Sequence, residues 1–238
     1  MSLLRSLTVA AVSLLSIAGA SELSQSTPSK VPAVFDRVYA PHGFDSNDHV
    51  QITGEGLFRN TCYRHAQTTV RIDNDAHQIF LGPVAYEYSG LCLQIILPFE
   101  RTIDLGLLKP GSWEVRQETS GALLGSLSIR EASSANADDF LYAPISQAFF
   151  RQSGADGEIL LTGEFSNSCL SLDRVETQVS ADSIVLQPIA RFDAGPSCST
   201  GKFPFSHVVT VLLIPPGRYL LHVRSMNGHA VNSLVEVR

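Results

Sequence analysis

CLQIILPFERTIDLGLLKPGSWEVR, residues 92–116, decides the fold, because the chain contains a version of this stretch twice. The second copy, CSTGKFPFSHVVTVLLIPPGRYLLHVR, spans residues 198–224. Both copies run from a cysteine to Pro-Phe, through an apolar strand-like run, to Pro-Gly-x-aromatic. The matched positions keep a constant offset of 106 residues and are Pro98 and Pro204, Phe99 and Phe205, Pro110 and Pro216, Gly111 and Gly217, and Trp113 and Tyr219. The duplication predicts two similar structural units.

The repeat divides the chain into a first domain at 34–131, a linker at 132–139 and a second domain at 140–238. The linker, ASSANADD, is small and polar, as connecting segments usually are. Shorter echoes extend the repeat and are Tyr39-Ala40-Pro41 with Tyr142-Ala143-Pro144, Ile52-Thr53-Gly54-Glu55 with Leu161-Thr162-Gly163-Glu164, and Asn60-Thr61-Cys62 with Asn167-Ser168-Cys169.

Each unit contains about seven short strand-like segments with turn signals between them, and no helical period of useful length. In the first unit, Gly56 predicts a bulge or bend, and strands at 93–97 and 101–107 flank Pro98. This pattern is typical of antiparallel β-sandwiches of about 100 residues. The predicted fold class is therefore all-β, with two tandem antiparallel sandwiches.

The N-terminus, MSLLRSLTVAAVSLLSIAGA, predicts a cleavable signal peptide at 1–20. Its apolar run is shorter than the roughly 20 residues that span a bilayer, so a transmembrane anchor is the weaker interpretation. No cysteine follows the cleavage site, so a lipid anchor is not indicated. Residues 21–33 are polar and predict a flexible leader. We expect a secreted or periplasmic protein without a membrane span after cleavage.

Four cysteines in an exported chain predict two disulfides, with three possible pairings. The repeat selects Cys62–Cys92 and Cys169–Cys198, one bridge in each unit. Zinc is the alternative, but the short Cys-x-x-Cys spacings of zinc sites are absent from the sequence.

The two Pro-Gly-x-aromatic segments resemble the corner between strands E and F in fibronectin-III-type and other immunoglobulin-like domains. The resemblance implies an immunoglobulin-like sandwich in which Trp113 and Tyr219 close one end, each after its own Pro-Gly turn. One departure concerns the disulfide. The immunoglobulin bridge joins strands B and F, whereas Cys92 and Cys198 precede the corner aromatic. The bridge here is expected to link the end of strand B to the segment before strand E.

Oxygen and nitrogen ligands for a metal occur near the start of the first unit. The candidates are Asp45, Asp48, His42, His49 and His65, with Asp73 and Asp75 as a second acidic turn. Calcium often binds at acidic turns of extracellular β-domains, but Asp and Asn are also the commonest turn formers. Scattered surface histidines are the simpler interpretation, and no cofactor is expected.

No nucleophile motif, phosphate-binding glycine loop or Asn-x-Ser/Thr acceptor occurs, so we expect no enzymatic activity. The formal net charge of −6 argues against nucleic acid and anionic membrane as partners. Phe149-Phe150 is the one adjacent aromatic pair. Since neighbouring strand residues point to opposite faces, one ring must face away from the core, where it could contact the first domain or a partner.

The sequence favours an exported, non-enzymatic binding or structural module whose partner is a protein or another envelope or extracellular ligand. The alternative is a metal-dependent factor or enzyme with its site in the first domain or between the two domains. A third interpretation is an accessory pair of a cell-envelope assembly that exchanges strands with its partner.

Overall fold

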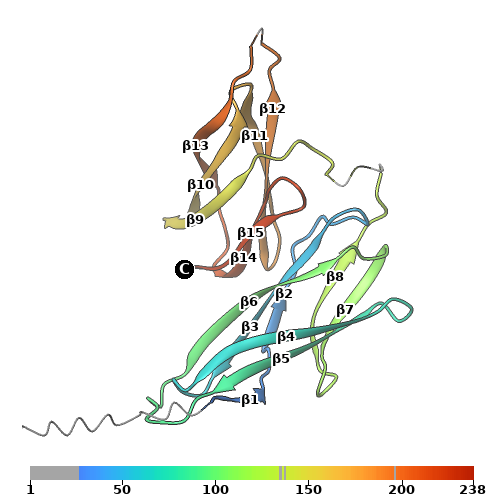
Figure 1. The fold of residues 1–238 in the computed structure, drawn as a ribbon, viewed down its shortest axis with the longest axis vertical. Coiled ribbons are helices and arrows are strands. Elements are labelled where there is room, and N and C mark those ends of the chain that lie inside the picture. The colour runs from blue at the N-terminus through green and yellow to red at the C-terminus, as the bar shows by residue number, and fades with distance from the viewer. Residues whose placement is uncertain (1–26, 134–135, 137, 196) are drawn as a thin grey trace, which may run out of the picture.

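The computed structural model describes residues 27–133, 136, 138–195 and 197–238, and within them every regular element is a β-strand (Figure 1). The expected signal peptide and the start of the leader lie outside the described residues. The strands are β1 (Ser29–Pro32), β2 (Arg37–Tyr39), β3 (Val50–Phe58), β4 (Tyr63–Asp73), β5 (Gln78–Glu87), β6 (Leu97–Gly106), β7 (Gly111–Gln117), β8 (Leu123–Ile129), β9 (Ile145–Ser153), β10 (Asp156–Asn167), β11 (Leu170–Val179), β12 (Ser183–Phe192), β13 (Thr200–Val211), β14 (Gly217–Arg224) and β15 (Ala230–Val237).

The first half of the chain forms two sheets around one core. One sheet has the order β1-β5-β7-β8 with β4 also paired to β5, and the other has the order β2-β3-β6. Alternate residues of the strands point inward, as in β7, where Trp113 and Val115 are fully buried while Ser112 is exposed and Glu114 and Arg116 are partly exposed. Ile52 of β3 and Leu81 of β5 join them in a single apolar cluster.

The second half repeats this pairing pattern with its own core. Its sheets have the orders β11-β12-β14-β15 and β13-β10-β9. Each pairing among β3–β8 therefore has a counterpart among β10–β15, and β9 takes the place of β2. A register shift lies after His65 in β4 and after Leu172 in β11, so even this irregularity is repeated. The duplication read from the sequence is confirmed at the level of strand pairing.

One part of the expected fold is wrong: the sheets are not purely antiparallel. β5 pairs parallel with β7, and β12 pairs parallel with β14. Strand alternation records which face of a strand is buried, but it does not record which strand lies beside it. The parallel pairs are therefore invisible in the sequence pattern.

Three local expectations are also corrected. Residues 29–32, assigned to the flexible leader, form β1 and pair with β5. Residues 93–96 are not a strand, and β6 starts at Leu97 and runs straight through Pro98. Gly56 lies in regular pairing with Phe99 and forms no bulge.

The register of the repeat also needs correction at its start. Ala33 donates a backbone hydrogen bond to Pro83, and Ala143 donates the same bond to Pro188. The counterpart of Tyr142-Ala143-Pro144 is therefore residues 32–34, and the match to residues 39–41 is a coincidence of sequence. By the same reasoning Gly163 corresponds to Gly56 and not to Gly54. Gly163 is paired with Phe205 and Gly56 with Phe99, the phenylalanines of the two Pro-Phe motifs.

Both disulfides form as expected, Cys62 with Cys92 and Cys169 with Cys198. Cys62 follows β3, and Cys92 lies in the loop before β6. In the first half the bridge thus ties the end of β3 to the loop that leads into β6. In the second half it ties the end of β10 to the loop that leads into β13. Two disulfides indicate an oxidising compartment. Among the described residues there is no helix of the length and apolar character needed to cross a bilayer.

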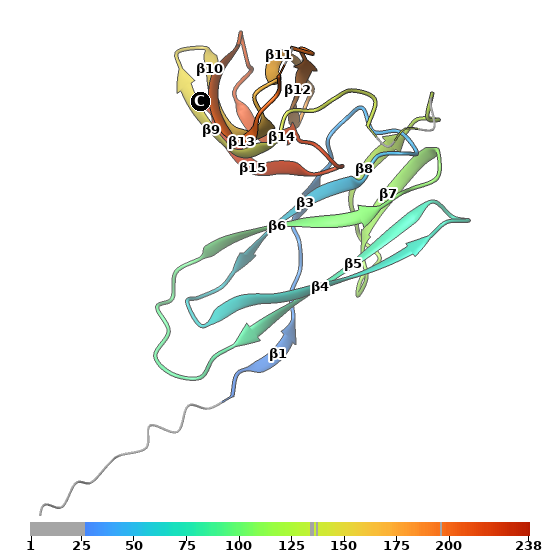
Figure 2. The same cartoon turned by 45° about the horizontal axis from the view of Figure 1, so that its top comes forward.

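The two halves touch through polar side chains. Figure 2 shows β15 of the second half beside β3 of the first, where the amide of Asn232 donates a 2.8 Å hydrogen bond to Gln51. Arg218 forms a 2.6 Å ion pair with Glu55 across the same boundary. These contacts lead into a more deeply buried cluster.

Candidate functional site

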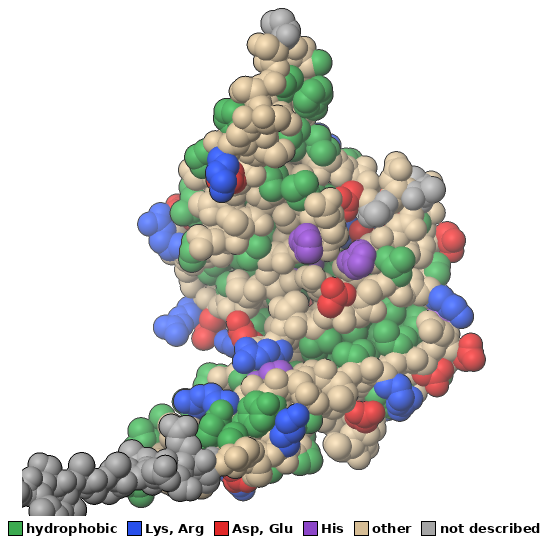
Figure 3. All heavy atoms as spheres, viewed as in Figure 1, with side chains coloured by type: hydrophobic (Ala, Val, Ile, Leu, Met, Phe, Trp, Pro, Cys, Tyr) green, Lys and Arg blue, Asp and Glu red, His purple; other side chains and the backbone are tan. Residues whose placement is uncertain are grey.

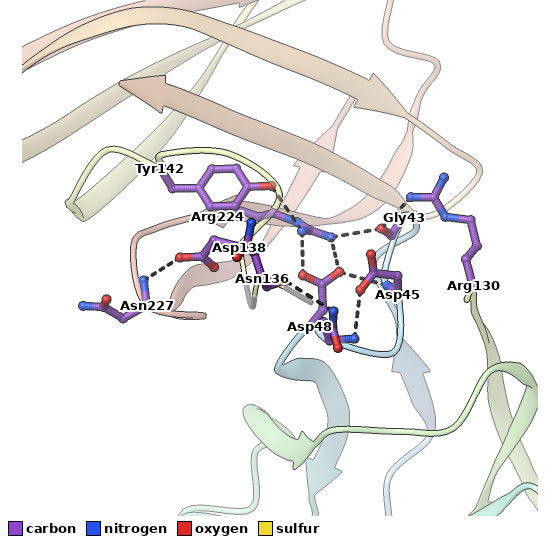
Figure 4. Close-up of polar contacts among 10 residues, drawn as sticks. Gly43, Asp45, Asp48, Arg130, Asn136, Asp138, Tyr142, Arg224 and Asn227 are labelled. Atoms are coloured by element: carbon purple, nitrogen blue, oxygen red, sulfur yellow. Dashed lines mark hydrogen bonds and ion pairs between the residues drawn. The ribbon is translucent and has the colours of Figure 1, made fainter. Parts of the chain in front are cut away.

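A buried ion pair joins the two halves. The guanidinium of Arg224, at the end of β14, donates to both carboxylate oxygens of Asp48, at 2.9 and 3.0 Å (Figure 4). The same guanidinium donates to the hydroxyl of Tyr142 at 3.3 Å and to the carbonyl of Gly43 at 3.1 Å. Both charged side chains are more than nine-tenths buried. The loop between β2 and β3 is thereby fixed against the second half.

Hydrogen bonds within the turn hold the Asp48 carboxylate in position. The backbone amide of Asp45 donates to an Asp48 oxygen at 2.9 Å, and the amide of Asn47 donates to Asp45 at 2.9 Å. Such side-chain-to-backbone bonds are the usual reason for Asp and Asn in turns. Phe44, from the same loop, lies with its ring 5.4 Å from the Arg224 guanidinium.

Burial and pairing act in opposite directions on these groups. Burial raises the pKa of the Asp48 carboxyl, and the charge of Arg224 and the amide of Asp45 oppose that rise. Burial also pulls the pKa of Arg224 down, but its attraction to Asp48 and Tyr142 raises it by more. The bidentate contact is the geometry in which a buried charge pair is best compensated.

His222 lies beside this pair on β14 and is buried. Desolvation lowers its pKa to about 4, against a hydrogen bond of 2.7 Å between Nδ1 and Asn232. Its ring meets that of Phe44 edge to face at 5.5 Å. His222 is therefore neutral at physiological pH and is part of the packing between the halves.

The residues that the sequence offered as metal ligands are engaged elsewhere or lie apart. Asp48 is occupied by Arg224, and Asp45 caps its own turn. His65 lies on β4, bonded to Thr68 and Arg101, and His42 and His49 are exposed. Within the described residues no three His, Cys, Asp or Glu side chains come together in a way that could hold a metal ion. The cavity left at the junction has a volume of only about 20 Å³.

A different place, the far end of the first half, exposes an apolar loop. Residues 88–96, YSGLCLQII, connect β5 to β6 and contain no charged side chain. Leu91 is fully exposed, Leu93 and Ile96 are each 67% exposed, and Ile95 is 50% exposed. In Figure 1 this loop is at the lower left, where β1 also starts.

The backbone of this loop is built in the same way in both halves. The amide of Tyr88 donates to the Cys62 carbonyl at 2.9 Å, and Asp193 donates to Cys169 at 2.9 Å. Leu93 exchanges two hydrogen bonds with Thr61, one through each amide. Ser199 exchanges the same two with Ser168. The same hydrogen-bonded loop backbone therefore accepts polar residues in the second half where the first half has apolar ones.

A groove opens next to the loop, with a volume of about 320 Å³. Its walls are mostly apolar and include residues 31–34 before β2 and Leu57 and Phe58 of β3. At one end the hydroxyl of Tyr63 donates to Glu87, and Arg59 contacts both of them. The charge of Glu87 is thus matched within the groove.

Phe149 and Phe150 divide between the two faces of β9, as strand alternation predicts. Phe150 packs against the second core, and Phe149 is 55% exposed beside Leu160 and Val208 of the neighbouring strands. Whether a partner covers Phe149 stays a prediction.

No protein-family model, curated protein or solved structure matches this chain. The site must therefore be judged from its own residues. The repeat itself carries the signal that sequence reasoning missed. Four aliphatic residues of the loop have small or polar residues at the matching positions of the second half. At the offset of 106, Leu91 corresponds to Ser197, Leu93 to Ser199, Ile95 to Gly201 and Ile96 to Lys202.

Proposed function

We propose that this chain is an exported, non-enzymatic binding module whose binding surface is the loop at 88–96. Each half is a variant of the immunoglobulin-like sandwich, with that fold's two-sheet plan and corner aromatic but with a parallel strand pair. The predicted signal peptide and the two disulfides support export.

The difference between the two copies of the loop carries this proposal. The two copies of the loop share three hydrogen bonds and a disulfide at the same position. Ser197 and Ser199 show that this loop backbone does not need leucine at 91 or 93. Exposed aliphatic side chains cost solubility, and a contiguous group of them marks an interaction surface. The simplest reason for them in one copy alone is a ligand.

The junction between the halves supports a structural interpretation rather than an active site. Small-molecule sites are clefts of about 300–1,000 Å³. The cavity of about 20 Å³ beside Arg224 is too small for a substrate. Its charged groups already satisfy one another. The junction instead fixes the first half, and with it the loop, relative to the second half.

Binding to the envelope of the producing cell tests the proposal. The wild-type chain is incubated with the combined membrane and wall fraction, sedimented and compared with a Leu91→Ser/Leu93→Ser variant. We expect the variant to melt at the wild-type temperature and to remain in the supernatant. Its matched control is Leu212→Ser/Leu213→Ser, which removes two leucines that are 68% and 78% exposed in the second half. Equal sedimentation of all three chains, or of none, would refute the assignment of the loop.

A further inference from the structure

The loop at 88–96 is the protruding end of a larger arrangement. Behind the aliphatic residues, Tyr86 and Tyr88 project from one face of β5 and its continuation, with their rings 6.4 Å apart. Tyr88 is 44% exposed. Strand register places Lys30 of β1 on one side of Tyr86 and Arg64 of β4 on the other. The Lys30 ammonium lies 5.9 Å from the centre of the Tyr86 ring.

This end of the molecule is basic although the chain is acidic. Lys30, Arg59 and Arg64 are all exposed, and the carboxylate of Glu87 is engaged by Arg59 and Tyr63. Figure 3 shows hydrophobic and basic side chains gathered at the lower left, over this end of the first half. Exposed charges are screened beyond a Debye length of about 10 Å. A partner that touches this end therefore meets the local excess of positive charge, and the net charge of −6 on the whole chain matters less.

We infer that this end of the first half binds the surface of a lipid bilayer that contains anionic headgroups, an inference that rests on the proposed function of the loop. Leu91, Leu93 and Ile96 enter the boundary between headgroups and acyl chains. Tyr86 and Tyr88 lie at headgroup level, where amphipathic rings are favoured. Lys30 and Arg64 contact the anionic headgroups. Tyr88 lies nearest the aliphatic tip, and Tyr86 lies level with Lys30 and Arg64 behind it. An aliphatic tip followed by aromatic and basic groups is the order of a membrane interface.

The loop is held ready for insertion. Cys92 ties it to Cys62, and the paired hydrogen bonds between Thr61 and Leu93 fix it at a second point. A preformed loop loses little conformational freedom when it enters the bilayer. The exposed aliphatic side chains belong to the loop, and none of them lines the neighbouring groove. A bilayer can cover them without a pocket of complementary shape.

Vesicle co-sedimentation tests the lipid. The probes are vesicles of phosphatidylcholine alone and vesicles in which about a third of the lipid is phosphatidylglycerol, a composition chosen for a strong negative surface potential. All chains are exported from the same cell and checked for an identical N-terminus, so that only the substitutions differ. We expect the wild-type chain to prefer the anionic vesicles. Leu91→Ser/Leu93→Ser should weaken partitioning about a hundredfold, roughly tenfold for each buried leucine.

A charge variant separates the basic layer from the apolar tip. Lys30→Gln/Arg64→Gln should weaken binding to anionic vesicles about fivefold for each charge, and this loss should shrink in high salt. The same variant should bind phosphatidylcholine vesicles as the wild type does. Leu212→Ser/Leu213→Ser is the control that should leave both kinds of vesicle binding unchanged.

Vesicle binding that survives Leu91→Ser/Leu93→Ser overturns the inference. If the loop is needed for sedimentation with the envelope fraction but no vesicle binds, the partner is a protein or wall polymer, and only the lipid inference fails. A concentration-dependent dimer that the loop substitutions abolish, without vesicle binding, would show that the occupant is a second copy. Absence of both vesicle and envelope binding would overturn this inference and the proposed function together.

Discussion

The indole of Trp113 donates a 2.9 Å hydrogen bond to the backbone carbonyl of Lys109, four residues before it. Tyr219 does the same in the second half, donating from its hydroxyl to Pro215 at 2.9 Å. Two different aromatic groups thus close the same turn with the same bond. Trp113 is fully buried and Tyr219 nearly so. The rings are therefore core residues that also fix the Pro-Gly corner.

Truncating either corner ring should destabilise the half that contains it. Removing a buried aromatic side chain costs about 3–5 kcal/mol. For a unit of about 100 residues this lowers the melting temperature by more than about ten degrees. We expect this result in thermal melts of Trp113→Ala and Tyr219→Ala.

Tyr219→Phe is the matched control, because it keeps the ring and removes only the hydrogen bond to Pro215. Its cost should be near 1 kcal/mol. If Trp113→Ala melts like the wild type and loses binding instead, the corner is a contact surface and the structural interpretation is wrong.

Removing the Cys62–Cys92 bridge should have two effects. The chain-entropy model gives a loss of roughly 3.5 kcal/mol for a loop of this length. The 29-residue separation of Cys169 and Cys198 predicts a similar loss for the second bridge. Only Cys62→Ala/Cys92→Ala also releases the apolar loop, so it alone should reduce sedimentation with the envelope fraction. Unfolding titrations beside the sedimentation assay measure both effects. Loss of sedimentation by the Cys169→Ala/Cys198→Ala protein while it is still folded would contradict this localisation.

Gly56 and Gly163 should both resist replacement by alanine. A Cβ on Gly163 would lie 1.9 Å from the Pro144 carbonyl oxygen and 2.8 Å from the Phe205 ring. On Gly56 it would lie 2.5 Å from the Val34 oxygen and 2.7 Å from Phe99. We expect each alanine variant to lose about 1–3 kcal/mol from this overpacking, as measured by unfolding titrations. Gly195 has no heavy atom within 4 Å of its added Cβ, so Gly195→Ala should be neutral.

These glycines show what the sequence could and could not predict. A glycine in a strand can mark a bulge or a close approach, and the sequence signal is the same for both. The repeat identified the disulfide pairs and the corner residues, because those depend on residue type at a fixed spacing. It misplaced the N-terminal match at residues 39–41, because three identical letters outweighed the strand register that only hydrogen bonds reveal.

The junction illustrates a second limit. Asp48 and Arg224 are 176 residues apart, and at the offset of 106 their matches are Gly154 and Glu118, so no repeat or spacing connects them. Asp48 was interpretable only as a turn residue or metal ligand. The apolar loop was different, since comparing the two copies of the repeat at 91 and 93 would have found it in the sequence alone.

Breaking the Asp48–Arg224 pair should be costly. Asp48→Ala leaves a buried guanidinium without its partner, a loss of about 3–5 kcal/mol. The double variant Asp48→Ala/Arg224→Met removes both charges and should recover part of that loss. Unfolding titrations of the single and double variants measure the coupling. As a control, Glu158→Ala breaks an exposed pair with Arg151 and should cost less than about 1 kcal/mol. Additive losses in the double variant would show that the pair does not stabilise the junction.

His222 should make the stability of the protein depend on pH in a defined window. Its pKa is about 4 in the folded chain, against an ordinary value of 6.5. Between these values the unfolded chain takes up a proton that the folded chain does not, so stability falls as pH falls from 6.5 towards 4. Below the folded-state pKa the loss of unfolding free energy is complete, at about 3 kcal/mol. Carboxylates also titrate near the lower end, so the measurement is the difference between the wild type and His222→Gln. Unfolding titrations from pH 7 to pH 4 should show a shallower pH dependence in the variant. Parallel curves would mean that burial at the junction does not hold the His222 ring neutral.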